Sequence, residues 1–238
     1  MTDGVERYRA RARGVAAQAQ GSRVLDVGCG TGGFLAALGE LGWEGIGIER
    51  SPDAVRAARA KGLTVQECTL DDARIEQHSF DLVTMLHVLE HLPDPASALE
   101  RISGALRRGG TLWVEVPNRE AWAAGVWPPA QRHVFDLPHH LHHFSASSLQ
   151  RLLRETGYVG VDVTVSVPPL LLGLVDGAAR ARRALLSSRR AAPPTSGSGP
   201  EMRRPAQASA PGSGARTLNA IRRTLPGWKL TARAVRSR

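Results

Sequence analysis

The feature that most constrains the fold is an alternation of short apolar runs with helix-like segments between residues 23 and 117. Each run has the length and composition of a buried strand, and most runs are followed by a segment with helical periodicity. The runs cover residues 23–28, 44–49, 63–68, 80–88 and 110–117. Because strands joined through helices pair in parallel, the pattern predicts an α/β fold with a doubly wound sheet.

Two of the intervening helices carry clear start signals. Ser51 is a candidate N-cap, Pro52 suits the first helical position that follows it, and Gly62 ends that helix. Asp94 and Pro95 form the same pair of signals before a later helix. These residues predict where two of the helices that cover the sheet begin.

Regular elements also flank this central region. An Arg/Ala-rich helix over 2–19 precedes the first strand, and residues 117–144 are irregular. An amphipathic helix over 145–157 and an alternating, half-exposed edge strand over 158–167 follow, and a last strand is predicted over 228–235. The chain therefore returns to the sheet at its C-terminal end.

The segment before that last strand differs in composition and charge. Residues 170–215 begin with an apolar and then arginine-rich part and continue as a Pro/Gly/Ser/Ala-rich stretch that we expect to be disordered. Residues 170–238 carry 14 Lys+Arg against 2 Asp+Glu, a net +12, whereas residues 1–169 carry 17 against 20, a net −3. We therefore predict a core over 1–169, a basic insertion over 170–215, and a C-terminal helix and strand over 216–238.

The cysteines and the apolar runs bear on the compartment. Cys29 and Cys68 cannot form a disulfide framework and lack metal-ligand spacing, which favours a reducing cytoplasm. No run of about 18 apolar residues exists that would span a membrane. The polar N-terminus lacks the apolar core of a signal peptide, so we expect a cytoplasmic protein.

The turn after the first strand is the strongest site signal. The stretch "VLDVGCGTGG" places four glycines there, with Asp26 before them, and Glu49 ends the second strand 21 positions after Gly28. Glycines let a ligand approach the backbone closely, and a carboxylate at the end of the second strand can accept both hydroxyls of a ribose. The Gly-Lys-Ser/Thr sequence of an NTP phosphate loop is absent. These features predict a nucleoside-type cofactor.

The segment from Val24 to Tyr158 resembles the class I S-adenosylmethionine-dependent methyltransferases, and most of all the group of the ubiquinone-biosynthesis O-methyltransferases. The motifs that carry the resemblance are "VLDVGCGTG", "SFDLVTMLHVLEHLPDP", "LRRGGTLWVEVPN" and "HLHHFSASSLQRLLRETGY". It implies a seven-stranded, mostly parallel sheet with an antiparallel last strand pair. It also implies S-adenosylmethionine as the cofactor and a small-molecule methyl acceptor, for which we expect oxygen as the acceptor atom.

The resemblance also implies a set of cofactor-site residues: Asp26, Gly28, Gly30, Glu49, Asp71, Leu86 and His87. Gly28 and Gly30 would face the methionine part of the cofactor and Glu49 the ribose. Asp71, or its neighbour Asp72, would lie beside the adenine. Leu86 and His87, at the end of the fourth strand, would line the inner side of the cofactor. Asp26 of the first strand would support the turn through hydrogen bonds.

Four histidines lie within five consecutive positions of "PHHLHHF", residues 138–144. A hydroxyl acceptor needs a base with a pKa near the working pH, which histidine supplies, and the resemblance places His140 near the mouth of the active site. We therefore name His140 as the candidate base or acceptor-orienting residue, with helix capping or loop packing as the alternative. No Cys or carboxylate cluster stands beside these histidines in the sequence, so we expect no metal here.

A second histidine motif follows the fourth strand. His87, Glu90 and His91 spell the H-x-x-E-H signature of inverted zinc proteases, but the motif stands directly after a core strand and lacks its required context. Relatives of the ubiquinone type suggest a divalent cation in this turn, although His87 would then replace a carboxylate, and hard Mg²⁺ prefers oxygen ligands. The remaining alternative is that Glu90 and His91 tie the loop to its neighbours. We predict no metal site.

The other partners are predicted from the less regular segments. Trp122, Trp127 and Phe135 are expected to form an apolar lid over the acceptor. Residues 170–190 suit a helix that lies on an anionic membrane without crossing it, or that covers the acceptor pocket. The basic tail raises an alternative function, a methyltransferase of RNA or another nucleic acid, although the core lacks an Asn-Pro-Pro-Tyr-type motif. The sequence does not indicate an oligomeric state.

Overall fold

The computed structural model describes residues 3–120, 136, 138–166 and 229–237. Its contacts divide the chain into two compact units, Met1–Ser166 with Pro226–Arg238, and Val167–Leu225. The described residues belong to the first unit. The predicted lid, the insertion over 170–215 with its membrane segment, and the short C-terminal helix lie outside the described residues.

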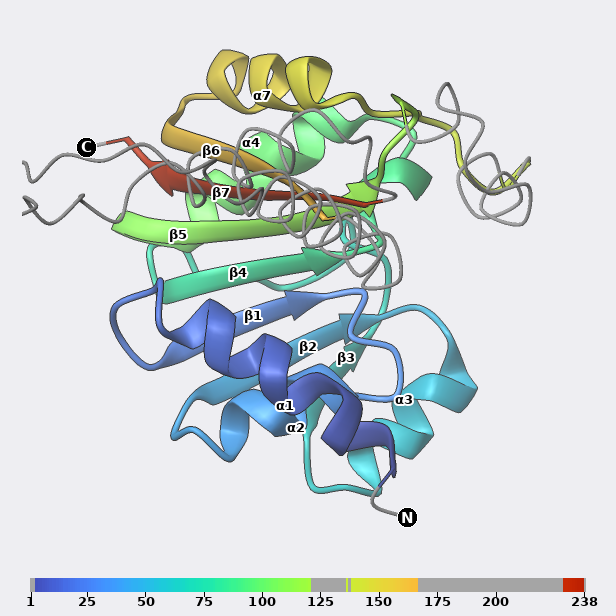
Figure 1. Ribbon diagram of the computed structural model, residues 1–238. Coiled ribbons are helices and arrows are strands. Elements are labelled where there is room, and N and C mark those ends of the chain that lie inside the picture. The colour runs from blue at the N-terminus through green and yellow to red at the C-terminus, as the bar shows by residue number, and fades with distance from the viewer. Residues whose placement is uncertain (1–2, 121–135, 137, 167–228, 238) are drawn as a thin grey trace, which may run out of the picture. The chain divides into compact units, whose positions relative to one another are not determined.

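A seven-stranded sheet with the order β3-β2-β1-β4-β5-β7-β6 forms the centre of the first unit. The strands are β1 (Arg23–Val27), β2 (Glu44–Glu49), β3 (Thr64–Glu67), β4 (Phe80–Leu86), β5 (Leu106–Pro117), β6 (Tyr158–Ser166) and β7 (Lys229–Arg236). The first five pair in parallel, and β7 runs antiparallel between β5 and β6 (Figure 1). This order confirms the predicted doubly wound, mostly parallel sheet with an antiparallel last strand pair.

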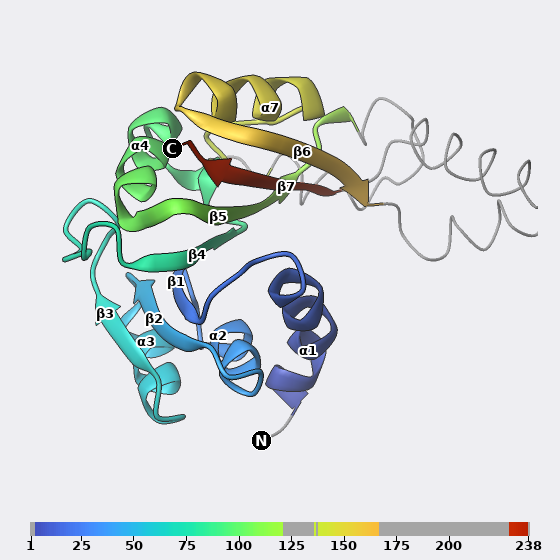
Figure 2. The same ribbon diagram turned by 90° about the vertical axis from the view of Figure 1, so that its left-hand side faces the viewer.

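Helices cover both faces of the sheet. They are α1 (Asp3–Ala16), α2 (Gly33–Gly39), α3 (Pro52–Arg59), the 3-10 turn η1 (Leu89–His91), α4 (Pro95–Ala105) and α7 (Ala146–Glu155). Alternate strand residues face opposite sides, so Val24 packs with α1 and α2, whereas Leu25 packs with α4 and α7. Figure 2 shows the first pair of helices on one side of the sheet and the second pair on the other.

The predicted helix starts are confirmed by their capping bonds. The Ser51 hydroxyl accepts a hydrogen bond from the Ala54 N–H at 3.5 Å, and Pro52 begins α3. The Asp94 carboxylate accepts two bonds of 3.0 Å from the first turn of α4. Short polar side chains satisfy helix N–H groups that would otherwise lack partners, so local sequence fixes these two starts.

Strand β5 begins at Leu106, earlier than the predicted start at residue 110. Leu106 pairs with Phe80, and regular pairing resumes between Thr111 and Leu82, so the intervening residues of β5 form a bulge. Gly110 lies in this bulge, where an added Cβ would come within 2.9 Å of the Arg107 carbonyl oxygen. The sequence pattern of Gly109 and Gly110 is typical of a loop, but the two residues lie within an irregular part of strand β5.

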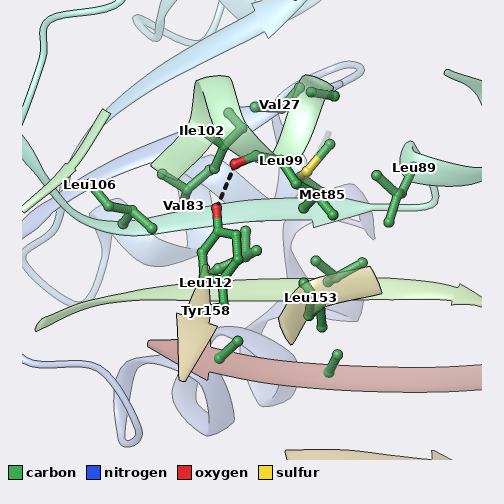
Figure 3. Packing of buried hydrophobic residues seen from close by; sticks show 14 of the residues in the cluster. Val27, Val83, Met85, Leu89, Leu99, Ile102, Leu106, Leu112, Leu153 and Tyr158 are labelled. Carbon is green, nitrogen blue, oxygen red and sulfur yellow. Dashed lines mark hydrogen bonds between the residues drawn. The ribbon is translucent and has the colours of Figure 1, made fainter. Parts of the chain in front are cut away.

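The main hydrophobic cluster also anchors the edge strand. Tyr158 begins β6 with 2% of its surface exposed, and its hydroxyl donates a hydrogen bond of 2.9 Å to the Leu99 carbonyl oxygen of α4 (Figure 3). Leu99, Leu112 and Leu153 belong to the same hydrophobic cluster (Figure 3). The tyrosine therefore links the last strand pair to a helix of the parallel half.

Over the ranges that the structure covers, no helix has the length and apolar character to cross a bilayer.

We predict that Tyr158→Phe lowers the free energy of unfolding by about 1 kcal/mol, because the variant keeps the ring and loses one buried hydrogen bond. Denaturant unfolding monitored by circular dichroism measures the difference. Val159→Ala, a change at the half-exposed neighbouring position, should alter stability by less than about 0.5 kcal/mol. Equal stability of wild type and Tyr158→Phe would show that the hydroxyl contributes nothing to the packing.

Candidate functional site

The glycine turn is fastened to the neighbouring strand at the carboxyl edge of the sheet. The N–H groups of Gly28 and Cys29 both donate to the Ile48 carbonyl oxygen, at 2.8 and 3.1 Å. Gly28, Gly30 and Gly32 have φ values of 67°, 54° and 75°. Residues with side chains rarely adopt this conformation, so the turn requires glycine for its shape.

The three glycines differ in what a side chain would meet. A Cβ at Gly28 would lie 2.4 Å from a methyl group of Val88, and one at Gly32 would lie 2.3 Å from a methyl group of Leu63. A Cβ at Gly30 would meet no atom within 4 Å. Packing therefore explains the first and third glycines, whereas Gly30 faces open space, as expected for a backbone that a ligand approaches.

The Glu49 carboxylate bridges two segments at this edge. Its Oε2 accepts a hydrogen bond of 2.9 Å from the Gly30 N–H, and its Oε1 accepts one of 2.8 Å from the Ser51 N–H. Each carboxylate oxygen has a second lone pair that can accept a hydroxyl hydrogen. The backbone thus holds the half-buried carboxylate in place, and its oxygens can still accept two hydrogen bonds from a diol such as a ribose.

Asp26 lies beneath the turn rather than on its surface. The side chain is 2% exposed, and its Oδ1 accepts a hydrogen bond of 2.6 Å from the Thr84 hydroxyl of β4. Burial raises the pKa of Asp26 from 3.8 to about 7, the Thr84 bond opposes this shift, and the nearby Glu49 charge adds to it. The bond to Thr84 joins β1 to β4, which supports the turn indirectly through the sheet.

The other predicted cofactor residues follow the third strand or lie at the end of the fourth, and Asp71 lines a hollow beside α4 with Ser97 and Arg101. Asp71 and Asp72 are exposed after β3, and the Asp72 carboxylate accepts a bond of 2.6 Å from the Thr69 hydroxyl. Leu86 ends β4 half-buried, and His87 follows it with a φ of 58° while its N–H donates to the Glu115 carbonyl oxygen. Figure 1 shows the arrowheads of β1, β2 and β4 pointing to the carboxyl edge of the sheet. Contact of these residues with a cofactor stays a prediction.

The structure brings together the two histidine motifs that the sequence separates. The N–H groups of Leu141 and His142 donate to the Glu90 carbonyl oxygen at 2.9 and 3.1 Å, which fastens this segment to η1. The ring centroids of His91 and His140 lie 4.7 Å apart, and His140 is 7% exposed. The role of His140 as a base stays a prediction.

One group of side chains in the described part of the chain has the composition and spacing of a metal site. The potential ligand atoms of Glu90, His91 and His140 all lie within 4.8 Å of one another. The expectation of no metal rested on the lack of a carboxylate beside "PHHLHHF", and the fold supplies one from η1. No local sequence signal reveals this pairing, because it depends on how the segment before α7 returns to the end of β4.

Comparison with known proteins assigns the family. Residues 2–163 match the family described as "Methyltransferase domain". The chain belongs to this family. Its domain is a class I S-adenosylmethionine-dependent methyltransferase domain, as the motifs and the sheet order predict.

Relatives and solved structures agree with this assignment. A protein named ubiquinone biosynthesis O-methyltransferase from Xanthomonas campestris is 36% identical over 132 residues, which cover 52% of this chain and 55% of that protein. The chain thus matches about half the length of this relative. A solved structure of an S-adenosylmethionine-dependent methyltransferase from Archaeoglobus fulgidus has a TM-score of 0.62 at 18% identity. The match covers 97% of this chain and 94% of that one.

A second solved structure carries the cofactor. Phosphoethanolamine N-methyltransferase 2 from Haemonchus contortus, in complex with S-adenosyl-L-methionine, has a TM-score of 0.60 at 16% identity. The match covers 100% of this chain and 58% of that one. At such low identity both structures show the fold alone.

We predict that Gly30→Ala lowers the affinity for S-adenosylmethionine at least about tenfold, since the methyl group fills the space above the turn. Isothermal titration calorimetry measures the affinity. Gly42→Ala is a matched control: Gly42 has a φ of 86° and a Cβ there would also meet nothing within 4 Å. Both variants carry similar backbone strain, so equal losses of affinity would contradict a ligand site at Gly30.

A second prediction concerns pH. Because the pKa of Asp26 is raised in the folded chain, the folded state keeps a proton that the unfolded state has lost between pH 3.8 and about 7. The free energy of unfolding should therefore fall as the pH rises through this window, by up to about 4 kcal/mol. Asp26→Asn cannot lose a proton, so denaturant unfolding at several pH values should give a flatter curve for the variant. Parallel curves would show that Asp26 titrates normally.

Proposed function

We propose that the protein transfers a methyl group from S-adenosylmethionine to a small-molecule acceptor, and that the acceptor atom is oxygen. The observation that supports cofactor binding is the Glu49 carboxylate, held by the Gly30 and Ser51 N–H groups beside an open turn. The relatives named ubiquinone biosynthesis O-methyltransferase support oxygen as the acceptor atom.

The residues of the site serve mainly to bind and align. When bound, the cofactor supplies an electrophilic methyl group on a sulfonium ion. Glu49 accepts hydrogen bonds from the ribose hydroxyls, and the open backbone at Gly30 leaves space for the rest of the cofactor. In the proposed transfer the carbon–sulfur bond would break as a carbon–oxygen bond forms, S-adenosylhomocysteine would be the leaving group, and the hydroxyl proton would pass to solvent water. An in-line displacement of this kind gains most of its rate from alignment of the two reactants.

The nucleic-acid alternative depends on the basic C-terminal region. Residues 170–238 carry 14 basic against 2 acidic side chains, whereas the preceding part of the chain is slightly acidic. A positive segment favours phosphate-rich partners through long-range attraction that salt screens. The preceding part of the chain has a net negative charge and as a whole offers no such attraction, so a small neutral or hydrophobic acceptor fits the proposal better.

We predict that purified protein transfers label from radioactive S-adenosylmethionine to low-molecular-weight phenols or other hydroxyl compounds. A panel of hydroxyl, amine and thiol acceptors, together with total RNA, separates the alternatives, and release of S-adenosylhomocysteine measures turnover. The Gly30→Ala variant controls for label that is transferred without specific cofactor binding. Label in RNA alone would favour the nucleic-acid function, and label only in amines would contradict oxygen as the acceptor atom.

A further inference from the structure

Glu90 of η1 carries a buried carboxylate that lacks hydrogen-bond partners among the described residues. Its side chain is 1% exposed, and neither carboxylate oxygen has a hydrogen-bond partner among the residues that the structure describes. The His87 Nδ1 atom lies 3.4 Å from Oε1, where it would form an ion pair if its ring were protonated, but it makes no hydrogen bond to this oxygen. Burial of a charged carboxylate without compensation is strongly unfavourable, so a cation close to this group would stabilise it.

The imidazoles of His91 and His140 lie close enough to Glu90 to bind the same cation. One potential ligand atom each from Glu90, His91 and His140 lies within 4.8 Å of the other two. The backbone also holds the segments together, because the Glu90 carbonyl oxygen accepts the N–H groups of Leu141 and His142. The cluster lies at the carboxyl edge of the sheet, since η1 directly follows β4.

The orientation of His91 adds a second sign of a ligand. Its Nδ1 atom lies 2.9 Å from the His139 carbonyl oxygen. A carbonyl oxygen can only accept, so Nδ1 carries the hydrogen and the lone pair of the neutral ring resides on Nε2. Metal-bound histidines have this arrangement, in which a backbone carbonyl fixes the tautomer and the ring orientation.

We propose that Glu90, His91 and His140 bind one divalent transition-metal ion of the zinc type. One carboxylate oxygen and two imidazole nitrogens suit Zn²⁺, Co²⁺ or Ni²⁺, whereas Mg²⁺ and Ca²⁺ favour sites made of oxygen ligands. Zinc holds its ligands at about 2.0–2.2 Å, so two ligand atoms of one ion are at most about 4 Å apart. The three side chains therefore draw together by roughly an ångström on binding, which rotation about their side-chain bonds allows.

This ligand set differs from the H-x-x-E-H motif of the sequence. His87 is replaced by His140, which comes from the segment that leads into α7. The ion therefore joins η1 to that segment and compensates the buried Glu90 charge. Three protein ligands leave at least one coordination position for water or for an oxygen of a small molecule. A metal-bound His140 cannot act as a free base, so the site and the base role exclude each other.

The test measures metal binding directly and does not depend on methyl transfer. Full-length protein is stripped with a chelator and titrated with Zn²⁺ and with Mg²⁺ by calorimetry, and elemental analysis gives the stoichiometry. We expect one Zn²⁺ per chain and no comparable binding of Mg²⁺. Glu90→Gln, His91→Gln and His140→Gln should each weaken Zn²⁺ binding at least about tenfold, the loss seen even for outer partners of metal sites.

His139→Gln is the matched control, because His139 is an exposed histidine of the same segment and acts on His91 through its backbone. It should bind Zn²⁺ like the wild type. Circular dichroism and S-adenosylmethionine affinity establish that each stripped variant is folded, and three separate ligand variants guard against the failure of one. Equal Zn²⁺ binding by all variants, an equal loss in the control, or no stoichiometric Zn²⁺ in the wild type would overturn the proposal.

Discussion

The candidate site depends on one interaction, the bridge that the Glu49 carboxylate makes between the Gly30 and Ser51 N–H groups. It links the turn after β1 to the first turn of α3, so a single side chain positions two segments that come from different βα units. Both bonds are made within the chain itself, so the carboxylate does not have to reorganise when a ligand arrives. Such preorganisation lowers the cost of binding.

The sheet places this bridge at the carboxyl edge, and a cluster of charged side chains near the carboxyl end of β5 joins three elements. The Lys229 ammonium group donates to the Glu115 carboxylate at 2.6 Å, and Arg11 lies 3.5 Å from the same carboxylate. These residues belong to β7, β5 and α1, so the last strand, the middle of the sheet and the first helix meet at Glu115. Breaking a buried pair of this kind leaves an uncompensated charge, which is strongly destabilising.

Local signals in the sequence predict the elements well, because caps, glycine turns and apolar runs act over a few residues. Ser51, Asp94 and Gly30 all lie where their neighbours in the sequence indicate. The seven-stranded sheet with its antiparallel last pair was predicted from the family resemblance rather than from local pattern, and the order of its strands was not predicted. Contacts between distant segments, such as Glu115 with Lys229 or Glu90 with His140, were not predicted, since each depends on the assembled sheet. The capping box of Ser145 with Ser148 is a local signal that was missed, because the motif usually has Glu or Gln in place of Ser148.

We propose that Glu49 binds the ribose hydroxyls of the cofactor. A double-mutant cycle tests it most directly: calorimetry compares S-adenosylhomocysteine with its analogue that lacks both ribose hydroxyls, each on wild type and on Glu49→Gln. We expect removal of the hydroxyls to lower the affinity of the wild type much more than that of the variant. If the two losses were instead equal, so that the effects of protein and ligand changes simply add, Glu49 would not contact the ribose.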